Sequence, residues 1–456
     1  MIPYIHFKSQ RRLLRPENPF VAVDKPLVVF IDRATFEDGA DLEFLLKQAD
    51  GEKLFVISTE QEGNAQLVYT PRDDDMLEFT VTRSDGTVEH HGVPFVQQYK
   101  RIATSPDFTR WATPEEIERA FLAAQTAKKL EAHIFITNDK FLLEHKDIGI
   151  IVDSYPLNLA EATALIGLVQ RRRNNFKLVI EHQGTSTFTS NHGRWSFFWF
   201  ASRDLLPSAW RLISGCAQMP DNKCQNLALT AIARASNALK CRDHIHEQIF
   251  LEQTNSSTED AIFYLDFYLV SFTAAFDVLA RIADEIYQPT DSRGRRQRSI
   301  TWRGSWRQAL ANEDAALAAL MSPGAFNRDV LDFIASLRNY IHEEGLQGAM
   351  HIKNGKPAPV LLRVPEAEVL NIITIINRLT GGTWVVDYSH PEATFLELND
   401  LVEKITPLAI EALDSIMKAI DITKVSGYDP SKVEMAPPAD CPSQYELANI
   451  RKLLGL

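Results

Sequence analysis

The sequence HIFITNDKFLLEHKDIGIIVDSYPLNLAEATALIGLVQRRRNN, residues 133–175, decides how the N-terminal part of the chain folds. We interpret it as a buried strand that ends at Asp139, a short helix, a second buried strand that ends at Asp153, and a longer helix. Upstream, the apolar run 27–31 ends in the same way, at Asp32. In an open α/β sheet the ligand crevice lies at the carboxyl ends of the strands. The three aspartates are therefore candidates for one site.

The segments around this stretch predict the rest of an α/β domain. A second apolar strand is expected at 53–58, and the alternating residues between 60 and 98, with a turn at 84–86, predict a hairpin. Thr113 followed by Pro114 predicts the start of a helix that continues to about residue 130. We therefore expect a parallel sheet with crossover helices within residues 1–185.

Length and composition indicate a soluble protein of at least two domains. The chain has 456 residues and a formal net charge of -12, which argues against a uniformly basic nucleic-acid coat but permits a local basic groove. The four cysteines lack metal-ligand spacing, which favours a reducing, cytoplasmic setting without structural disulfides. The most apolar segment, residues 262–283, is broken by Asp266 and Asp277, so we expect no membrane span.

The second half of the chain has a different pattern. Residues 186–220 are irregular and carry an aromatic cluster at 195–200, which we interpret as a linker and interdomain packing segment. From residue 221 to residue 456 the pattern is almost purely helical, interrupted by a short strand, VLLRVP, and the segment TWVVDY. We expect a helical domain with a C-terminal tail there.

A family resemblance emerges from the first half. The segment ERAFLAAQTAKKLEAHIFITNDKFLL, residues 118–143, resembles the later half of PIN-domain nucleases, whose strand commonly ends in T-x-D, here Thr137-Asn138-Asp139. Asp32 matches the first acidic position of that family. The resemblance, over residues 27–173, implies a three-layer PIN-like α/β domain in which Asp32, Glu118 and Asp139 bind Mg²⁺ or Mn²⁺ and Asp32 and Asp139 are catalytic. The alternative is structural, because strand-end aspartates also cap the next helix or turn.

The helix expected at 326–344 carries a second constellation. Arg338 and His342 are four residues apart and share one face, where they can bind a phosphate and exchange a proton without metal. Arg338-Asn339 followed by His342 resembles the signature of the HEPN family, although the family usually separates its Arg and His by four to six residues rather than three. The resemblance, over residues 221–380, implies an all-α HEPN-like bundle, catalytic Arg338 and His342, and a homodimer through the helical domain. In the alternative, acidic residues on helix 261–287 hold Arg338 in a structural ion pair.

Two further segments contain arginine in patterns that could bind nucleic acid or serve the protein's own structure. The segment DSRGRRQRSITWRGSWR, residues 291–307, combines arginine with tryptophan, a composition that suits single-stranded nucleic acid. Its candidate contacts are Arg295, Arg296, Arg298, Trp302, Arg303 and Trp306. The alternative is a basic loop that docks on the protein's own acidic surface. Arg242 and His246 repeat the spacing of Arg338 and His342, and for them we expect a solvated helix face.

Together these patterns predict a nucleic-acid-directed protein. The two resemblances imply a ribonuclease-type effector acting on RNA in a toxin, stress or phage-defence setting. The competing prediction is a non-catalytic interaction or sensor protein that retains degenerate forms of both folds.

Overall fold

The stretch that begins at His133 contains β6 (Ile134–Ile136), α6 (Lys140–Glu144), β7 (Pro156–Leu157) and α8 (Leu159–Arg172). The first strand and the two helices agree with the prediction, whereas β7 lies after Asp153, where the second strand was expected to end. A capping box starts α8, in which Asn158 accepts from the backbone of Glu161 and the Glu161 side chain accepts from the backbone of Asn158. Asp153 lies outside the described residues.

The structure is a computed structural model in which the chain divides into two compact units, Met1–Asn191 with Lys452–Leu456, and His192–Arg451. Many residues inside elements, among them His342, are described by their backbone alone. The residues described are 26–37, 39–49, 54–58, 65–70, 76–94, 104–109, 112–145, 156–182, 186–191, 193–251, 254–297, 302, 304–343, 345–353, 356–364, 366–382, 384, 387–390, 393–433 and 444–456.

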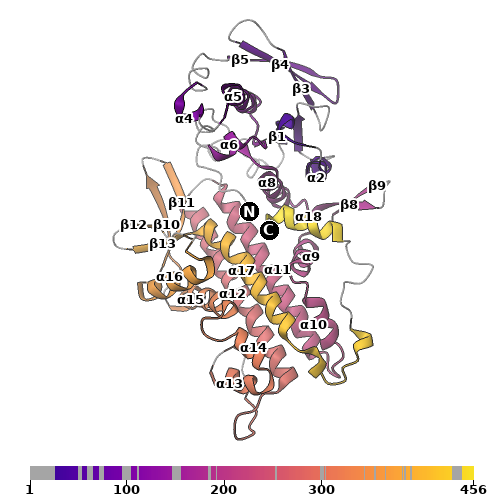
Figure 1. Cartoon of the computed structure of the whole chain (residues 1–456), viewed down its shortest axis with the longest axis vertical. Coiled ribbons are helices and arrows are strands. Elements are labelled where there is room, and N and C mark those ends of the chain that lie inside the picture. The colour runs from indigo at the N-terminus through magenta and orange to yellow at the C-terminus, as the bar shows by residue number, and fades with distance from the viewer. Residues whose placement is uncertain are drawn as a thin grey trace. The chain divides into compact units, whose positions relative to one another are not determined.

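The first unit is built on a mostly parallel sheet (Figure 1). Among the described residues, seven strands follow the order β5-β4-β3-β2-β1-β6-β7. Strand β1 pairs in parallel with β2 and β6, and β7 pairs in parallel with β6. The hairpin predicted between residues 60 and 98 is confirmed as the antiparallel edge formed by β4 and β5. The strands not yet placed are β1 (Leu27–Ile31), β2 (Leu54–Ser58), β3 (Ala65–Thr70), β4 (Met76–Arg83) and β5 (Val88–Pro94).

Helices cover this sheet. The helix predicted from Thr113 is confirmed as α5 (Pro114–Lys129), which begins with a capping box between Thr113 and Glu116. Its apolar side, including Phe121, packs with Phe30 and Phe135 in one buried cluster. The remaining elements of this unit are η1 (Arg33–Thr35), α2 (Ala40–Ala49), α4 (Pro106–Thr109) and the separate hairpin β8 (Lys177–His182) and β9 (Ser186–Asn191).

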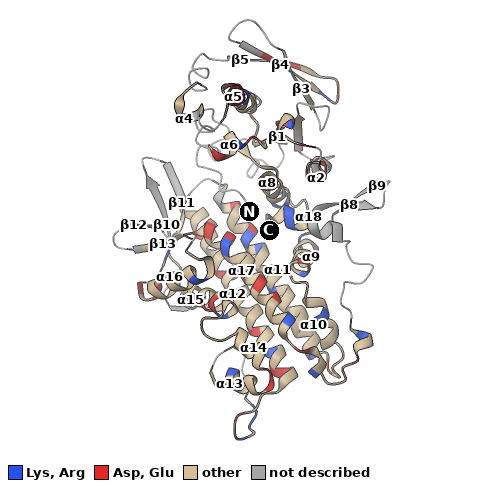
Figure 2. Cartoon of the chain, viewed as in Figure 1, with Lys and Arg blue, Asp and Glu red and all other residues tan. Residues whose placement is uncertain are grey.

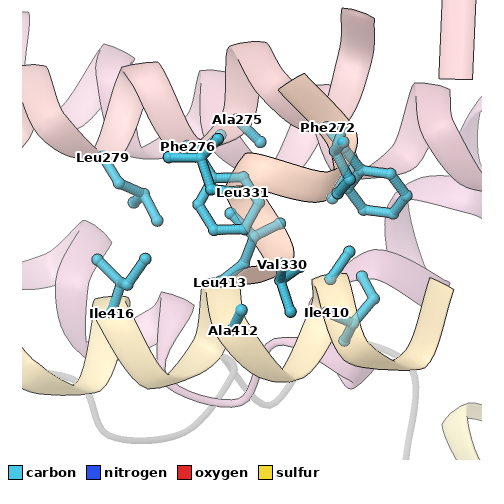
Figure 3. Packing of buried hydrophobic residues seen from close by; sticks show 14 of the residues in the cluster. Phe272, Ala275, Phe276, Leu279, Val330, Leu331, Ile410, Ala412, Leu413 and Ile416 are labelled. Carbon is cyan, nitrogen blue, oxygen red and sulfur yellow. The ribbon is translucent and has the colours of Figure 1, made fainter. Parts of the chain in front are cut away.

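The second unit is a helical bundle around the long helices α11 (Lys223–Ile249) and α12 (Asn255–Tyr287). Figure 3 shows apolar residues of α12, including Phe276, against those of α15 (Phe326–Glu343) and α17 (Leu398–Ala419), such as Leu331 and Leu413. The other helices are α9 (Gly193–Leu205), α10 (Ala209–Cys216), α13 (Gly304–Glu313), α14 (Ala315–Leu320), α16 (Val369–Thr380), α18 (Gln444–Leu454) and the 3₁₀ turns η2 (Glu366–Glu368), η3 (Ile422–Lys424) and η4 (Pro430–Lys432).

The prediction that this unit is all-α is wrong, because it also contains an antiparallel sheet. In the part of the chain that is described, four strands follow the order β10 (Gly348–Lys353), β11 (Lys356–Arg363), β13 (Ala393–Glu397) and β12 (Asp387–His390). Val360 and Leu362 of β11 and Leu396 of β13 are buried in the bundle core.

The segment predicted as a linker and interdomain segment, residues 186–220, contains regular secondary structure. Residues 186–191 form β9 and close the first unit, whereas α9 and α10 belong to the helical bundle. Phe197 and Phe198 of the aromatic cluster are buried there, and Trp195 is exposed and stacks on Trp199 with ring centroids 5.5 Å apart.

Figure 2 shows acidic and basic residues interspersed along the helices of the second unit. Among the described helices, α12 alone is long and apolar enough to cross a membrane, yet it is the core helix of the bundle, with residues such as Leu269 and Phe272 fully buried. A buried core helix passes the same test of length and composition as a membrane span.

Candidate functional site

Two of the predicted aspartates meet at one edge of the sheet. Asp32 follows β1 and Asp139 follows β6, and these strands are parallel neighbours with Ile31 opposite Ile136. The Asp32 amide donates to the Ile136 carbonyl at 2.9 Å, which extends the pairing to the strand ends. Both carboxylates are buried, with 6% and 7% of their residues' surface exposed. The carboxyl edge of the sheet therefore holds an acid pair, Asp32 and Asp139.

Threonine hydroxyls fix the backbone and side chains around the acid pair. Thr137 donates from Oγ1 to Asp32 Oδ2 at 3.3 Å and accepts from the Asp139 amide at 3.1 Å, so one side chain links the two acids. Thr35 Oγ1 donates to the Asp32 carbonyl at 2.8 Å and accepts from the Asn138 amide at 2.8 Å. These bonds tie the two strand ends together.

The environment of Asp32 disfavours its charged form. Burial raises the pKa of Asp32 to about 6, although the guanidinium of Arg119 and the Thr137 hydroxyl oppose that rise; the negative charge of Asp139 adds to it. Asp32 is therefore protonated below about pH 6 and ionised above it.

Asp139 has two partners. It caps α6, accepting from the Leu142 amide at 3.2 Å through Oδ1, and it accepts from Arg119 Nη2 at 2.8 Å through Oδ2. The capping bond matches the structural alternative for a strand-end aspartate. Arg119 reaches the pair from α5 and is half-exposed, with 49% of its side chain accessible.

Glu118, the third predicted ligand, is not brought into a group with the two aspartates. Within the described residues, no three His, Cys, Asp or Glu side chains come together closely enough to hold a metal ion. Glu118 is half-buried on α5, and its neighbour Arg119 is the residue of this helix that contacts the acid pair. Glu116, two residues before Glu118, is committed to the capping box, accepting from the Thr113 amide at 2.8 Å.

The helical constellation is described only in part. Arg338 lies on α15, half-buried, and donates from Nη1 to Asn339 Oδ1 at 2.8 Å. The side chain of His342 lies outside the described residues, so its approach to Arg338 stays a prediction. Asp284 on α12, one of the acids considered as a partner for Arg338, instead accepts from Arg296 at 3.1 Å.

The segment 291–307 contradicts the interpretation of its tryptophans as base-stacking residues. Trp302 and Trp306 are 0% and 2% exposed and belong to the bundle core. Their indole N–H groups donate to the Phe276 carbonyl at 2.8 Å and to Asp284 Oδ1 at 2.9 Å. A ring enclosed on both faces offers no platform to a base, so these residues anchor the loop.

Two of the described arginines of this segment form ion pairs within the protein. Arg295 contacts Asp291 at 3.2 Å and Arg296 contacts Asp284 at 3.1 Å. This arrangement matches the alternative in which the loop docks on the protein's own acidic groups. Arg298 and Arg303 lie outside the described residues.

The expectation of a solvated face at Arg242 and His246 is wrong. Both side chains are fully buried on α11, and each lies 2.9 Å from Glu403 Oε1 on α17. Burial alone would raise the pKa of Glu403, but the attraction of Arg242 and His246 outweighs it and lowers the pKa to about 2. The repeated Arg–His spacing was a signal for this network, because residues four apart on a helix can converge on one partner.

Comparison with family models, with curated proteins and with solved structures found no match to this chain. The PIN-like and HEPN-like resemblances therefore depend on the residues quoted above.

Proposed function

We propose that the first unit is a PIN-like domain that binds Mg²⁺ or Mn²⁺ at the acid pair and cleaves RNA. The observation that carries this proposal is the burial of Asp32 and Asp139 side by side at the carboxyl edge of a parallel sheet. Open α/β sheets bind their ligands at that edge. The biological setting would be that of a toxin, stress or phage-defence effector.

The acid pair fits a small divalent cation. Mg²⁺ is commonly held by one or two carboxylates, with water and substrate phosphate completing its shell, so a third protein carboxylate is not required. Burial raises the pKa of Asp32 to about 6, and a bound cation would favour its ionised form. Asp32 and Asp139 would hold the ion, and Thr137 would orient Asp32 through its hydroxyl.

A bound Mg²⁺ or Mn²⁺ would lower the pKa of its water and polarise a phosphodiester. Arg119 then has a separate task. Its half-exposed guanidinium can exchange the Asp139 carboxylate for an RNA phosphate, with which arginine forms paired charge-assisted hydrogen bonds. Ionised Asp32 is required in this scheme, so activity should rise with pH through about 6.

A second candidate function is favoured by one contact. The ion pair between Arg119 and Asp139, 2.8 Å long, already compensates one acid without metal. In that case the first unit is a non-catalytic interaction or sensor module, and any cleavage belongs to Arg338 and His342 in a HEPN-like second unit.

Cleavage of labelled single-stranded RNA separates these possibilities. Wild type would be incubated with Mn²⁺ or with EDTA, beside Asp139→Asn and His342→Ala. Asparagine still caps a helix, so Asp139→Asn removes the charge while sparing the start of α6. We expect cleavage that needs Mn²⁺ and is lost in Asp139→Asn. Cleavage that survives EDTA but not His342→Ala would transfer the chemistry to the second unit, and no cleavage in any tube would favour the interaction module.

A further inference from the structure

One face of α12 is apolar but lies outside the core of the helical bundle. Phe263, Phe267 and Val270 are 54%, 50% and 36% exposed, and Ala274 is half-buried. The rings of Phe263 and Phe267 contact each other edge to face, with centroids 4.9 Å apart. The residues between them, such as Leu265 and Leu269, point into the core. α12 therefore has two apolar sides, of which the bundle covers one.

The spacing of the exposed side is that of a helix-pairing surface. Residues 263, 267, 270 and 274 are separated by four, three and four positions, which keeps them on one line along the helix. Alternation of four and three is the pattern by which two helices pack side chains between one another. We call these four residues the α12 stripe.

Charged residues at the two ends of the α12 stripe indicate which partner the stripe binds. Continuing the same spacing leads to Asp260 before the stripe, and to Asp277 and Arg281 after it. Asp260 and Arg281 are exposed, whereas Asp277 is half-buried and makes contacts within its own chain. The stripe thus has an exposed acid at its N-terminal end and an exposed base at its C-terminal end.

We propose that the α12 stripe binds the α12 stripe of a second copy of this chain, with the two helices antiparallel. Asp260 lies ten residues before Val270 and Arg281 lies eleven after it, so both are about 15 Å from Val270 along the helix. A two-fold axis near Val270 brings Asp260 of each copy opposite Arg281 of the other. Parallel helices would instead place like charges together.

Such a contact is isologous and closes on itself, as in most homodimers. It buries two phenylalanines from each copy at its centre and leaves the ion pairs at its rim. Aromatic residues at the centre with charges at the edge are typical of protein interfaces. The proposal does not depend on the proposed nuclease activity, because no residue of the acid pair takes part.

Sedimentation velocity across a range of protein concentrations tests the surface. Wild type should be a dimer, and Phe267→Ser should weaken the dimer at least tenfold. Leu370→Ser is the matched control: Leu370 is 81% exposed on α16, away from the stripe, and its loss should leave the dimer unchanged. Melting curves of all variants establish that they are folded. A wild type that is monomeric at every concentration, or a dimer that Phe267→Ser leaves intact, would overturn the proposal.

Charge reversal tests the antiparallel orientation. Asp260→Arg and Arg281→Asp should each weaken the dimer, because each creates like-charge contacts. The double variant should restore it, since each reversed residue again faces its opposite. Failure of the double variant to regain dimerisation would reject the antiparallel pairing. Binding of a monomeric wild type to phosphatidylglycerol vesicles, lost in Phe267→Ser, would assign the stripe to a membrane surface instead.

Discussion

At the scale of single residues, Asp32 is the group whose ionisation matters most. Its pKa is 3.8 as an unperturbed group and about 6 in the fold, because burial penalises the carboxylate. Between these values the folded state binds a proton that the unfolded state has released. Stability therefore falls as pH rises through this window, and the ionised Asp32 costs roughly 3 kcal/mol above it.

The first prediction follows from that cost. Asp32→Asn should raise the melting temperature at pH 8, where wild type contains a buried charge, and should change it little at pH 4, where Asp32 is protonated. Thermal melts at several pH values without divalent metal measure this. An Asn variant that is equally stabilised at pH 4 and pH 8 would show that ionisation of Asp32 is not the cause.

A second prediction concerns Glu403, whose pKa is shifted in the opposite direction. The pKa falls from 4.5 to about 2, so the stabilisation by Arg242 and His246 is complete above pH 4.5 and is lost as pH falls through about 2. Glu403→Gln should destabilise the protein at pH 7 by about 3 kcal/mol or more, because it removes one side of a buried charge network. Urea denaturation at pH 7 and pH 3 should show a smaller difference at pH 3; a constant difference would contradict the account.

Of the acid pair and the network around Glu403, only the acid pair could be predicted from the sequence pattern. Asp32 and Asp139 could be predicted because each ends a short apolar run, and parallel strands place their ends together. The contact of Arg119 with Asp139 could not be predicted from the sequence, since only the path of α5 over the sheet brings the two residues together. Glu403 is 161 positions from Arg242, and no local pattern links residues on helices so far apart in sequence.

At the scale of elements, Arg119 and α5 determine access to the acid pair. The guanidinium competes with any divalent cation for Asp139 Oδ2. Arg119→Ala should therefore tighten Mn²⁺ binding at pH 7.5 while reducing affinity for RNA, and calorimetry with each ligand separates the two effects. Unchanged affinity for both ligands would remove Arg119 from the site.

The segment 291–307 shows how composition misleads when burial is unknown. Arginine interleaved with tryptophan suits nucleic acid, yet both indoles anchor the segment in the bundle through hydrogen bonds to α12. The sequence does not reveal that these tryptophans are buried, because tryptophan occurs both in protein cores and at interfaces.

Trp306→Phe tests that structural role. It removes the indole donor from Asp284 Oδ1, which should cost about 1–2 kcal/mol of stability. Arg295→Ala is the comparison, since Arg295 is exposed in its pair with Asp291 and exposed pairs contribute little. RNA affinity should be the same for wild type and Trp306→Phe. A loss of RNA affinity without a loss of stability would restore the base-stacking interpretation.

At the scale of the whole molecule, periodicity predicted an α/β unit followed by a helical unit, and both are present. The sheet β10-β11-β13-β12 was missed as a unit, because its strands come from two segments separated by α16. Antiparallel strands joined through a helix leave no single run of alternating residues to recognise.

The central claim is that the acid pair holds a divalent cation, and Mn²⁺ binding measured by calorimetry at pH 7.5 tests it most directly. Wild type should bind one Mn²⁺ per chain, and Asp32→Asn and Asp139→Asn should each abolish binding while Arg338→Ala leaves it intact. Wild-type affinity should fall below about pH 6, where Asp32 becomes protonated. No binding, or binding that both aspartate variants retain, would contradict the account.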